Sequence, residues 1–356
     1  MAVNFARAEE VGPALLRYIE ACTKISGIDY AEPPEAIVHG WETYIFSFLL
    51  RGDGLDRAWT RPLILRVYPG ADQGPKAERE AAVQRFAVER GYPAPRPLAV
   101  ETDSGVLGLP FMVMERAPGE PMLDRMTKHP LSVGRLARLM ADMHVALHEL
   151  PVNGCPLPSD GSLIERSARE FEELAGRSGL ELPSDVQRAF DWLLAHRSAV
   201  IPEEVSLCHH DFHPLNLLVD DEGGVTVLDW PSAALGDRHS DIASTLVLLR
   251  TAPAEPRSFL ERIMLRFGRG VLVWFYLRRY RQQLPIDRER LRYWEAVRSF
   301  EWWMRLTAFE AGGSAAVGVK EETAERIPLG HVNRMRRYFW QRARDEHRAR
   351  PVLRFP

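Results

Sequence analysis

The stretch LCHHDFHPLNLLVDDEGGVTVLDWPSAALGDRHSDIAS, residues 207–244, decides the fold that the sequence predicts. Asp211 lies five residues before Asn216, and Asn216 begins the first of two short apolar segments. These segments, NLLVD and VTVLDW, flank the turn sequence DEGG, which is typical of a β-hairpin. Asp229 lies at the end of the second segment, and because a hairpin reverses the chain, we expect this carboxylate to lie near Asn216.

These three polar side chains suit phosphoryl transfer. That reaction requires a carboxylate that orients and deprotonates the attacking hydroxyl, and oxygen ligands that hold magnesium on a triphosphate. Asp211 fits the first role. Asn216 and Asp229 fit the second, because magnesium prefers hard oxygen ligands and takes few of them from the protein. The spacing is that of the H-x-D-x-x-x-x-N catalytic loop and the metal-binding aspartate of kinases.

Two other interpretations of the same residues stay open at this point. Asp and Asn are common in turns and caps, so the three side chains could be structural. The cluster His209, His210, Asp211 and His213 could also bind zinc or iron, since imidazole and carboxylate are frequent transition-metal ligands. The second interpretation predicts a metal-dependent hydrolase, although no separate ligand motif accompanies the cluster.

The whole stretch resembles the aminoglycoside phosphotransferase and choline kinase-like family. That family reads approximately H-G-D-x-H-P-G-N, then a hairpin, I-D-W and G-D-x-x-x-D-I/L-A. Two positions depart from it, because His210 and Leu215 stand where the family has glycine. The equivalent residues here are His209, Asp211, His213, Pro214, Asn216, Leu228, Asp229, Trp230, Gly236, Asp237, Asp241, Ile242 and Ala243.

The resemblance implies a two-lobed protein-kinase-like fold of the α+β class. A small antiparallel-sheet N-lobe, residues 1–115, would bind the nucleotide, and a mainly helical C-lobe, residues 116–356, would carry the catalytic loop, the metal site and the substrate site. The resemblance also implies that His209 braces the loop and that Asp241 is a buried anchor. ATP, with GTP as an alternative, and Mg²⁺ are the implied cofactors.

The pattern of the first 116 residues fits such an N-lobe. Apolar residues at helical spacing predict a helix over residues 8–25, and an Ala-, Glu- and Arg-rich stretch predicts another over 76–90. Short runs rich in β-branched and aromatic residues, separated by Gly and Asp turns, predict strands. These strands are expected at residues 36–40, after Pro33 and Pro34, and at 43–50, 61–68, 96–100 and 109–116.

The nucleotide side of the site is predicted from the strand LILRVYPG and the helix that follows it. Arg66 lies on the strand face opposite Leu65 and Val67, where a kinase uses a lysine to bind the α- and β-phosphates. Arginine can bind phosphate in a bidentate manner, so the replacement is chemically reasonable. By resemblance, Glu80 pairs with this cation, and Glu78 is the fallback.

The adenine side is predicted from the resemblance alone. In PFMVMERAPGE, Met114 would border the pocket, and the carbonyl of Glu115 and the amide of Ala117 would hydrogen-bond the base. Phosphate cover would come from IVHGWETYIFSF, in which the single Gly40 is a weak signal.

Charge and composition limit the class of protein further. The net charge of the 356 residues is -3, yet residues 251–356 hold 22 Lys and Arg against 12 Asp and Glu. The basic residues alternate with Leu, Trp and Tyr at helical spacing, which favours the solvated face of helices over nucleic-acid binding. Without an apolar span or a signal peptide, no membrane association and a cytoplasmic location are expected. Cys22, Cys155 and Cys208 suggest neither a disulfide framework nor a metal site.

The acceptor is expected to be a small hydroxylated molecule. Only eleven residues separate Asp229 from Asp241, too few for the segment with which a protein kinase docks a polypeptide. The C-terminal basic surplus argues against a polycationic acceptor and suggests a neutral or partly apolar one, such as a macrolide-like compound. Arg66, His210 and Leu215 leave a nucleotide-binding pseudokinase without turnover as an alternative. Five tryptophans of this region, most of them expected in the core, are Trp274, Trp294, Trp302, Trp303 and Trp340.

Overall fold

The computed structural model describes most of the chain, in two compact units. The described residues are 8–37, 43–157, 184–197, 204–252, 258–317 and 330–343. The first unit comprises Met1–Ser159, Val205–Leu235 and Arg266–Leu284, and the second comprises Asp160–Glu204, Gly236–Leu265 and Pro285–Pro356. The division of the chain into lobes at Glu115 stays a prediction.

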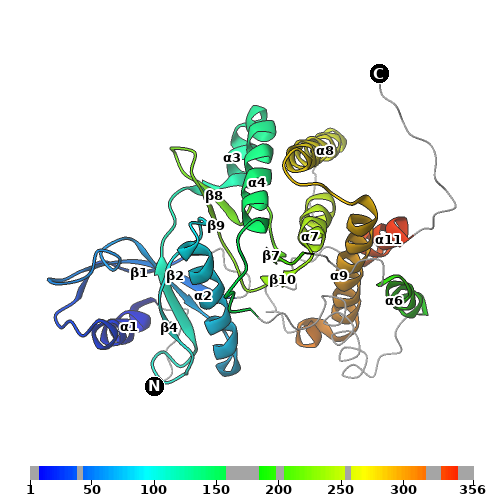
Figure 1. Ribbon diagram of the computed structural model, residues 1–356. Coiled ribbons are helices and arrows are strands. Elements are labelled where there is room, and N and C mark those ends of the chain that lie inside the picture. The colour runs from blue at the N-terminus through cyan, green and yellow to red at the C-terminus, as the bar shows by residue number, and fades with distance from the viewer. Residues whose placement is uncertain are drawn as a thin grey trace. The chain divides into compact units, whose positions relative to one another are not determined.

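A five-stranded antiparallel sheet organises the beginning of the first unit (Figure 1). Its strand order is β1-β2-β3-β5-β4, so β3 lies at the centre and pairs with both β2 and β5. The predicted strands at 43–50, 61–68, 96–100 and 109–116 are confirmed. The strands are β1 (Asp29–Ala36), β2 (Tyr44–Arg51), β3 (Leu63–Val67), β4 (Pro97–Glu101) and β5 (Phe111–Glu115).

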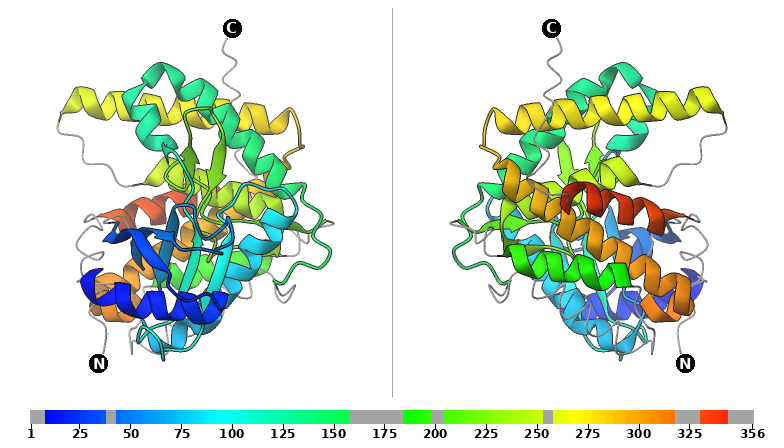
Figure 2. Two further views of the ribbon diagram at one scale, coloured as in Figure 1. Left: turned by 90° about the vertical axis from the view of Figure 1, so that its left-hand side faces the viewer. Right: turned by 90° about the vertical axis from the view of Figure 1, so that its right-hand side faces the viewer.

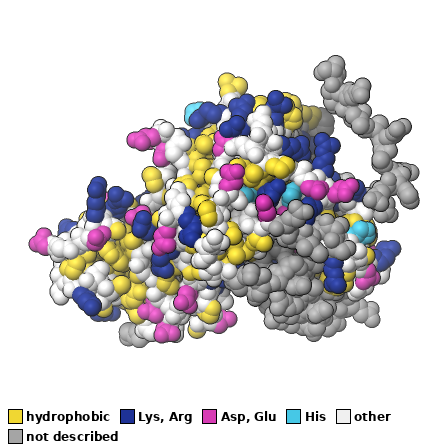
Figure 3. Space-filling view, in the orientation of Figure 1, with side chains coloured by type: hydrophobic (Ala, Val, Ile, Leu, Met, Phe, Trp, Pro, Cys, Tyr) yellow, Lys and Arg dark blue, Asp and Glu magenta, His cyan; other side chains and the backbone are white. Residues whose placement is uncertain are grey.

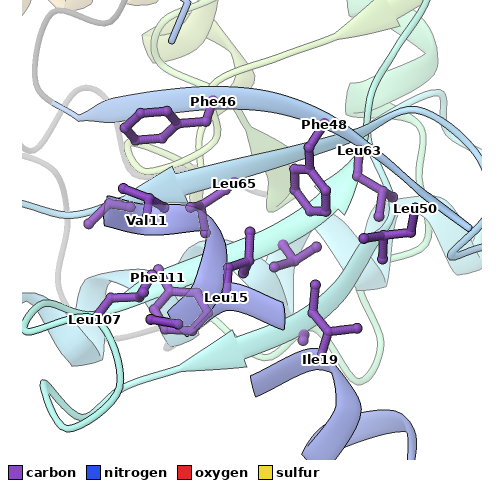
Figure 4. Close-up of a cluster of buried hydrophobic side chains, with 14 of the residues drawn as sticks. Val11, Leu15, Ile19, Phe46, Phe48, Leu50, Leu63, Leu65, Leu107 and Phe111 are labelled. Carbon is purple, nitrogen blue, oxygen red and sulfur yellow. The ribbon is translucent and has the colours of Figure 1, made fainter. Parts of the chain in front are cut away.

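Each face of this sheet is covered by one of the two predicted helices. On one face α1 (Ala8–Thr23) buries an apolar stripe that includes Leu15 and Ile19 against Leu65 and Phe111 (Figure 4). On the other face, α2 (Gly74–Glu89) packs small residues such as Ala81 against Ile64, Met112 and Met114. Because side chains alternate along β3, Arg66 lies on the α2 face, as the sequence predicted.

The first strand differs from its prediction. The sequence placed it after Pro33 and Pro34, at residues 36–40, but β1 runs from Asp29 to Ala36 and contains both prolines. Prolines are tolerated there because β1 is an edge strand and the pairing with β2 is interrupted by register shifts. Residues 38–40 of the predicted strand lie outside the described residues.

The first unit continues with the predicted hairpin, which is confirmed. β8 (Leu217–Val219) and β9 (Val225–Val227) pair antiparallel, and β6 (Glu120–Pro121) extends them to a three-stranded sheet. β7 (Ser206–Cys208) pairs with β10 (Ala234–Gly236). The short helical segments of this unit are η1 (Ala71–Gln73), α3 (Met122–Lys128) and η2 (Pro130–Ser132).

One further helix and most of another complete the first unit. α4 (Val133–His148) lies beside the C-terminal half of α8 (Phe259–Arg281) (Figure 2). Asp142 accepts a hydrogen bond from Arg279 Nε at 2.6 Å, and the imidazoles of His144 and His148 each lie 2.7 Å from a tyrosine hydroxyl of α8. Buried polar pairs of this kind fix how two helices pack, because each polar atom needs its partner.

The second unit is built around one long helix. α9 (Arg288–Val317) contacts α6 (Ser184–His196), α7 (Arg238–Thr251) and α11 (His331–Ala343), which Figure 2 shows packed around it. The buried carboxylate of Glu295 on α9 binds Arg250 of α7, and Tyr338 and Arg342 of α11. Some basic residues of this region therefore neutralise a buried acid.

Charged side chains, tryptophans and helix hydropathy describe the surface of the described residues. Acidic and basic side chains are interspersed over the five-stranded sheet region on the face that Figure 3 shows. Trp294 and Trp303 are buried, as expected of core tryptophans, whereas Trp274 and Trp302 are exposed. None of the described helices combines the length and the apolar character needed to cross a bilayer.

Candidate active site

A buried ion-pair relay connects the sheet, α2 and the end of the hairpin. Arg66 Nη1 lies 3.1 Å from Glu80 Oε1, and Arg66 Nη2 donates to Asp229 Oδ1 at 2.8 Å. The hydroxyl of Tyr68 donates to the other oxygen of Glu80 at 2.7 Å. The structure thus brings the predicted cation together with Glu80, while the fallback Glu78 is exposed.

Burial and charge determine the protonation of this relay. Burial alone would lower the pKa of Arg66, but Glu80 and Asp229 raise it overall, so the guanidinium stays charged. Burial raises the pKa of Glu80, and Arg66 opposes that rise. The Nε atom of Arg66 is buried without a hydrogen-bond partner among the described residues, so the guanidinium keeps donor capacity beyond its two carboxylate contacts.

Sequence reasoning missed Tyr68 as a member of the relay. Its hydroxyl orients the buried carboxylate of Glu80, and burial raises the pKa of Tyr68, so it is a neutral donor at physiological pH. A signal was present, since Tyr68 follows Arg66 by two residues and therefore points to the same side of the strand.

The predicted catalytic loop before β8 holds Asp211 and Asn216 in direct contact. Asn216 Nδ2 donates to Asp211 Oδ2 at 2.8 Å and to the Asp211 carbonyl at 3.0 Å. His213 Nε2 lies 3.2 Å from Asp211 Oδ1, and the amide of Leu215 donates to His213 Nδ1 at 3.3 Å. We assign the ring proton to Nε2 on this basis, so that His213 donates to the carboxylate even when neutral.

This environment keeps Asp211 ionised. Burial would raise the pKa of its carboxyl group, but the hydrogen bond and charge of His213, the charge of His209 and the hydrogen bond from Asn216 outweigh burial and lower the pKa below its ordinary value. A carboxylate that is negatively charged and held by hydrogen bonds on both oxygens has a fixed orientation. Such a group can orient a hydroxyl and accept its proton.

Backbone pairing brings Asp229 next to this loop, as the hairpin predicted. The amide of Leu228 donates to the Asn216 carbonyl at 2.8 Å, so the residue before Asp229 is paired with Asn216 itself. His209 is fully buried and its Nε2 lies 2.9 Å from the Leu228 carbonyl, which fits the bracing role that the resemblance implied. Asp229 adopts a left-handed backbone with φ of 66°, which is uncommon outside glycine.

The donor set fits a hard divalent cation. Both side-chain hydrogen bonds of Asn216 use its amide nitrogen, so the carbonyl oxygen Oδ1 is the atom that could bind a metal. The side chain of Asp229 is 38% exposed and keeps a second carboxylate oxygen besides the one that binds Arg66. One amide oxygen and one carboxylate are the few protein ligands that magnesium takes when phosphates and water supply the rest.

The predicted adenine-binding residues lie at the end of β5. Met114 is buried on the α2 face of the sheet, beside Ile64 and Met112. The amide of Glu115 donates to the Arg96 carbonyl at 2.9 Å, so the sheet extends to this residue, and Ala117 follows two positions later. Their contacts with a base stay a prediction.

The histidine cluster does not form a metal centre. The candidate ligand atoms of His209, His210, Asp211 and His213 do not gather three at a time within 4.8 Å among the described residues. His210 Nδ1 lies instead 3.3 Å from the Ser232 carbonyl. The imidazoles are thus directed at backbone and at Asp211, and the zinc or iron interpretation has no geometric support here.

Comparison with known proteins finds one family model and several curated relatives. A model of the "Phosphotransferase enzyme family" matches residues 35–283, well over half of the chain. An aminoglycoside 3'-phosphotransferase of Streptomyces fradiae is 33% identical over 187 residues, which cover 48% of this chain and 66% of that protein. The mouse protein "Acyl-CoA dehydrogenase family member 10" is 26% identical over 222 residues, which cover 58% of this chain and 20% of that protein. The chain spans less than two thirds of either relative.

A solved structure shares the fold along nearly the whole chain. A thermostable mutant of aminoglycoside phosphotransferase APH(4)-Ia, in a ternary complex with ADP and hygromycin B, matches with a TM-score of 0.59 at 17% identity. The match covers 90% of this chain and 97% of that one, and it confirms the predicted α+β, protein-kinase-like fold. The family match over residues 35–283 establishes that the chain belongs to the phosphotransferase enzyme family.

Proposed function

We propose that this protein is an ATP-dependent kinase that transfers the γ-phosphate to a hydroxyl group of a small molecule. The observation that carries the proposal is the convergence of Arg66, Glu80 and Asp229 in one relay, with the Asp211–Asn216 pair joined to it through Leu228. Family membership and the named phosphotransferase relative support it.

Each residue then has one role. Asn216 Oδ1 and the Asp229 carboxylate would hold Mg²⁺, which neutralises charge on the β- and γ-phosphates when bound. Arg66, fixed by Glu80, would bind the inner phosphates through its remaining donor capacity. Asp211 orients the acceptor hydroxyl and accepts its proton. The strand-to-hinge residues Met114 to Ala117 of the N-lobe would bind the adenine.

The acceptor is proposed to be neutral or partly apolar. Leu215, which replaces a glycine of the resembling family, is 47% exposed and directly precedes Asn216. Its isobutyl group places an apolar surface beside the catalytic loop, which offers a polycation no favourable electrostatic contact. Trp303 is buried and therefore belongs to the core, whereas Trp302, 38% exposed, keeps the capacity to contact a ligand. A glycosylated or macrolide-like alcohol fits this chemistry better than an aminoglycoside.

Calorimetric titration of the full chain tests the nucleotide half of the proposal. ATP and GTP are titrated with magnesium and with EDTA, into the wild type and Asp229→Ala. Magnesium is expected to strengthen ATP binding in the wild type, and the substitution should remove about tenfold or more of that gain, since it deletes a charged ligand. Binding of neither nucleotide would overturn the proposal.

A screen for phosphorylated products separates the kinase from a nucleotide-binding module without turnover. Neutral glycosylated alcohols and aminoglycosides are offered with radiolabelled ATP, and Asp211→Asn serves as the matched inactive control. Transfer by the wild type alone supports the kinase. Tight magnesium–ATP binding with no transfer to any acceptor, and no release of phosphate to water, would favour the pseudokinase.

A further inference from the structure

Arg79 of α2 binds the chain just beyond Asp229. Its Nη1 donates to the Pro231 carbonyl at 3.2 Å, and its Nη2 donates to the Ala233 carbonyl at 2.6 Å. A planar guanidinium can hold two carbonyls two residues apart, whereas the single ammonium of a lysine cannot match that fork. An arginine on a helix is ordinarily a solvated side chain, so this contact is a specific feature of the fold.

His210 holds the carbonyl between those two. Its ring is buried, and Nδ1 lies 3.3 Å from the Ser232 carbonyl. Its backbone is in the left-handed region, with φ of 61°, which costs free energy for any residue other than glycine. The resembling family has glycine at this position, so this chain accepts backbone strain next to Asp211 while gaining a side-chain contact with Ser232.

Three consecutive carbonyls, those of residues 231–233, are therefore fixed by side chains from two other elements. The neighbour of Arg79 on the same helix, Glu80, acts on the other side of Asp229, because it pairs with Arg66, which binds the Asp229 carboxylate. Two adjacent residues of α2 thus restrain both the side chain of Asp229 and the backbone that follows it.

We propose that Arg79 and His210 are positioning residues that hold the 231–233 segment and thereby fix the carboxylate of Asp229 for magnesium. The inference rests on the proposed function, because it assigns Asp229 to the metal. Asp229 has a left-handed backbone, and such a conformation persists only where the surrounding structure determines it. Releasing the segment lets Asp229 relax, so the affinity for magnesium falls more than the affinity for the nucleotide.

The test measures the ratio of ATP affinities with magnesium and with EDTA, using calorimetry on the full chain. Arg79→Ala should lower this ratio by about tenfold, as expected for the loss of charged hydrogen bonds, while the affinity in EDTA stays unchanged. Arg79→Lys should restore part of the ratio, because the single ammonium group can still donate to one of the two carbonyls. Arg85→Ala, which removes an exposed arginine from the same helix, should leave the ratio at the wild-type value.

Variants of His210 test the proposal independently. His210→Ala should lower the magnesium ratio, and His210→Gln, whose amide can donate to the Ser232 carbonyl, should restore much of it. A role in stability alone would lower the melting temperature without changing the ratio, so thermal unfolding is recorded for every variant.

The possible failures are distinguishable. A wild type whose ATP affinity does not respond to magnesium refutes the proposed function itself. A wild type that responds, with the same ratio in Arg79→Ala and Arg85→Ala, refutes only the positioning role. Should Arg79→Ala fail to fold, Arg79→Lys and His210→Ala decide the matter, because an unchanged ratio in both variants would contradict the inference.

Discussion

Asp211 is the side chain on which turnover should depend most directly. Asp211→Asn keeps the size of the group and removes its basicity, so phosphate release from ATP, with water as acceptor, should fall by about 100-fold or more. The dissociation constant of magnesium–ATP should change little, because the residue is not assigned to the metal. Phosphate release at the wild-type rate would contradict the assignment of the base.

His213 should set the pH range in which the proposed base, Asp211, works. The active form is the carboxylate, and its lowered pKa keeps it ionised at more acidic pH than an ordinary aspartate. His213→Ala removes the donor to Asp211 Oδ1, so the pKa should rise and the acid limb of the phosphate-release profile should move to higher pH. His129→Ala, an exposed histidine, is the control. Superimposable acid limbs for the three proteins would contradict this prediction.

At the scale of elements, α2 is anchored to the sheet by a buried charge. Glu80→Gln should lower the free energy of unfolding by about 3 kcal/mol, because it leaves Arg66 buried with only Asp229 as a charged partner. Glu78→Gln, two residues earlier and exposed, should change it by less than about 0.5 kcal/mol. Chemical denaturation at neutral pH measures both. Equal losses would mean that the relay does not stabilise the helix.

Elements and site were predictable from the sequence to different degrees. The hairpin is a local feature, so the pairing of Asn216 with Leu228, which brings Asp229 next to the loop, followed from chain reversal alone. Alternation along β3 placed Arg66 on the correct face. Arg79 could not be found in this way, because its partners lie 152 and 154 residues away and are backbone carbonyls, which no side-chain pattern marks. The predicted position of the first strand, after Pro33 and Pro34, was wrong because an edge strand tolerates proline where its backbone is not paired.

At the scale of the whole molecule, the two units should respond unequally to nucleotide. A ligand at 100 times its dissociation constant stabilises the native state by about 2.7 kcal/mol. It slows hydrogen exchange only where exchange requires a local unfolding that disrupts the binding site. Hydrogen exchange with and without magnesium–ATP should therefore show protection in β3, the catalytic loop and the β8–β9 hairpin. The helices α9 and α11 should change little. Protection confined to those two helices would place the nucleotide elsewhere.

The two prolines of β1 affect how the edge of the sheet can interact with other polypeptides. The free edge of a sheet is a template on which another polypeptide can add a strand, and long flat edges are sites of aggregation. At Pro33 and Pro34 the backbone has no amide proton, and the register of β1 is broken at the same place. A second chain would find no regular ladder there, so the sheet that carries Arg66 is protected from growing into an intermolecular one.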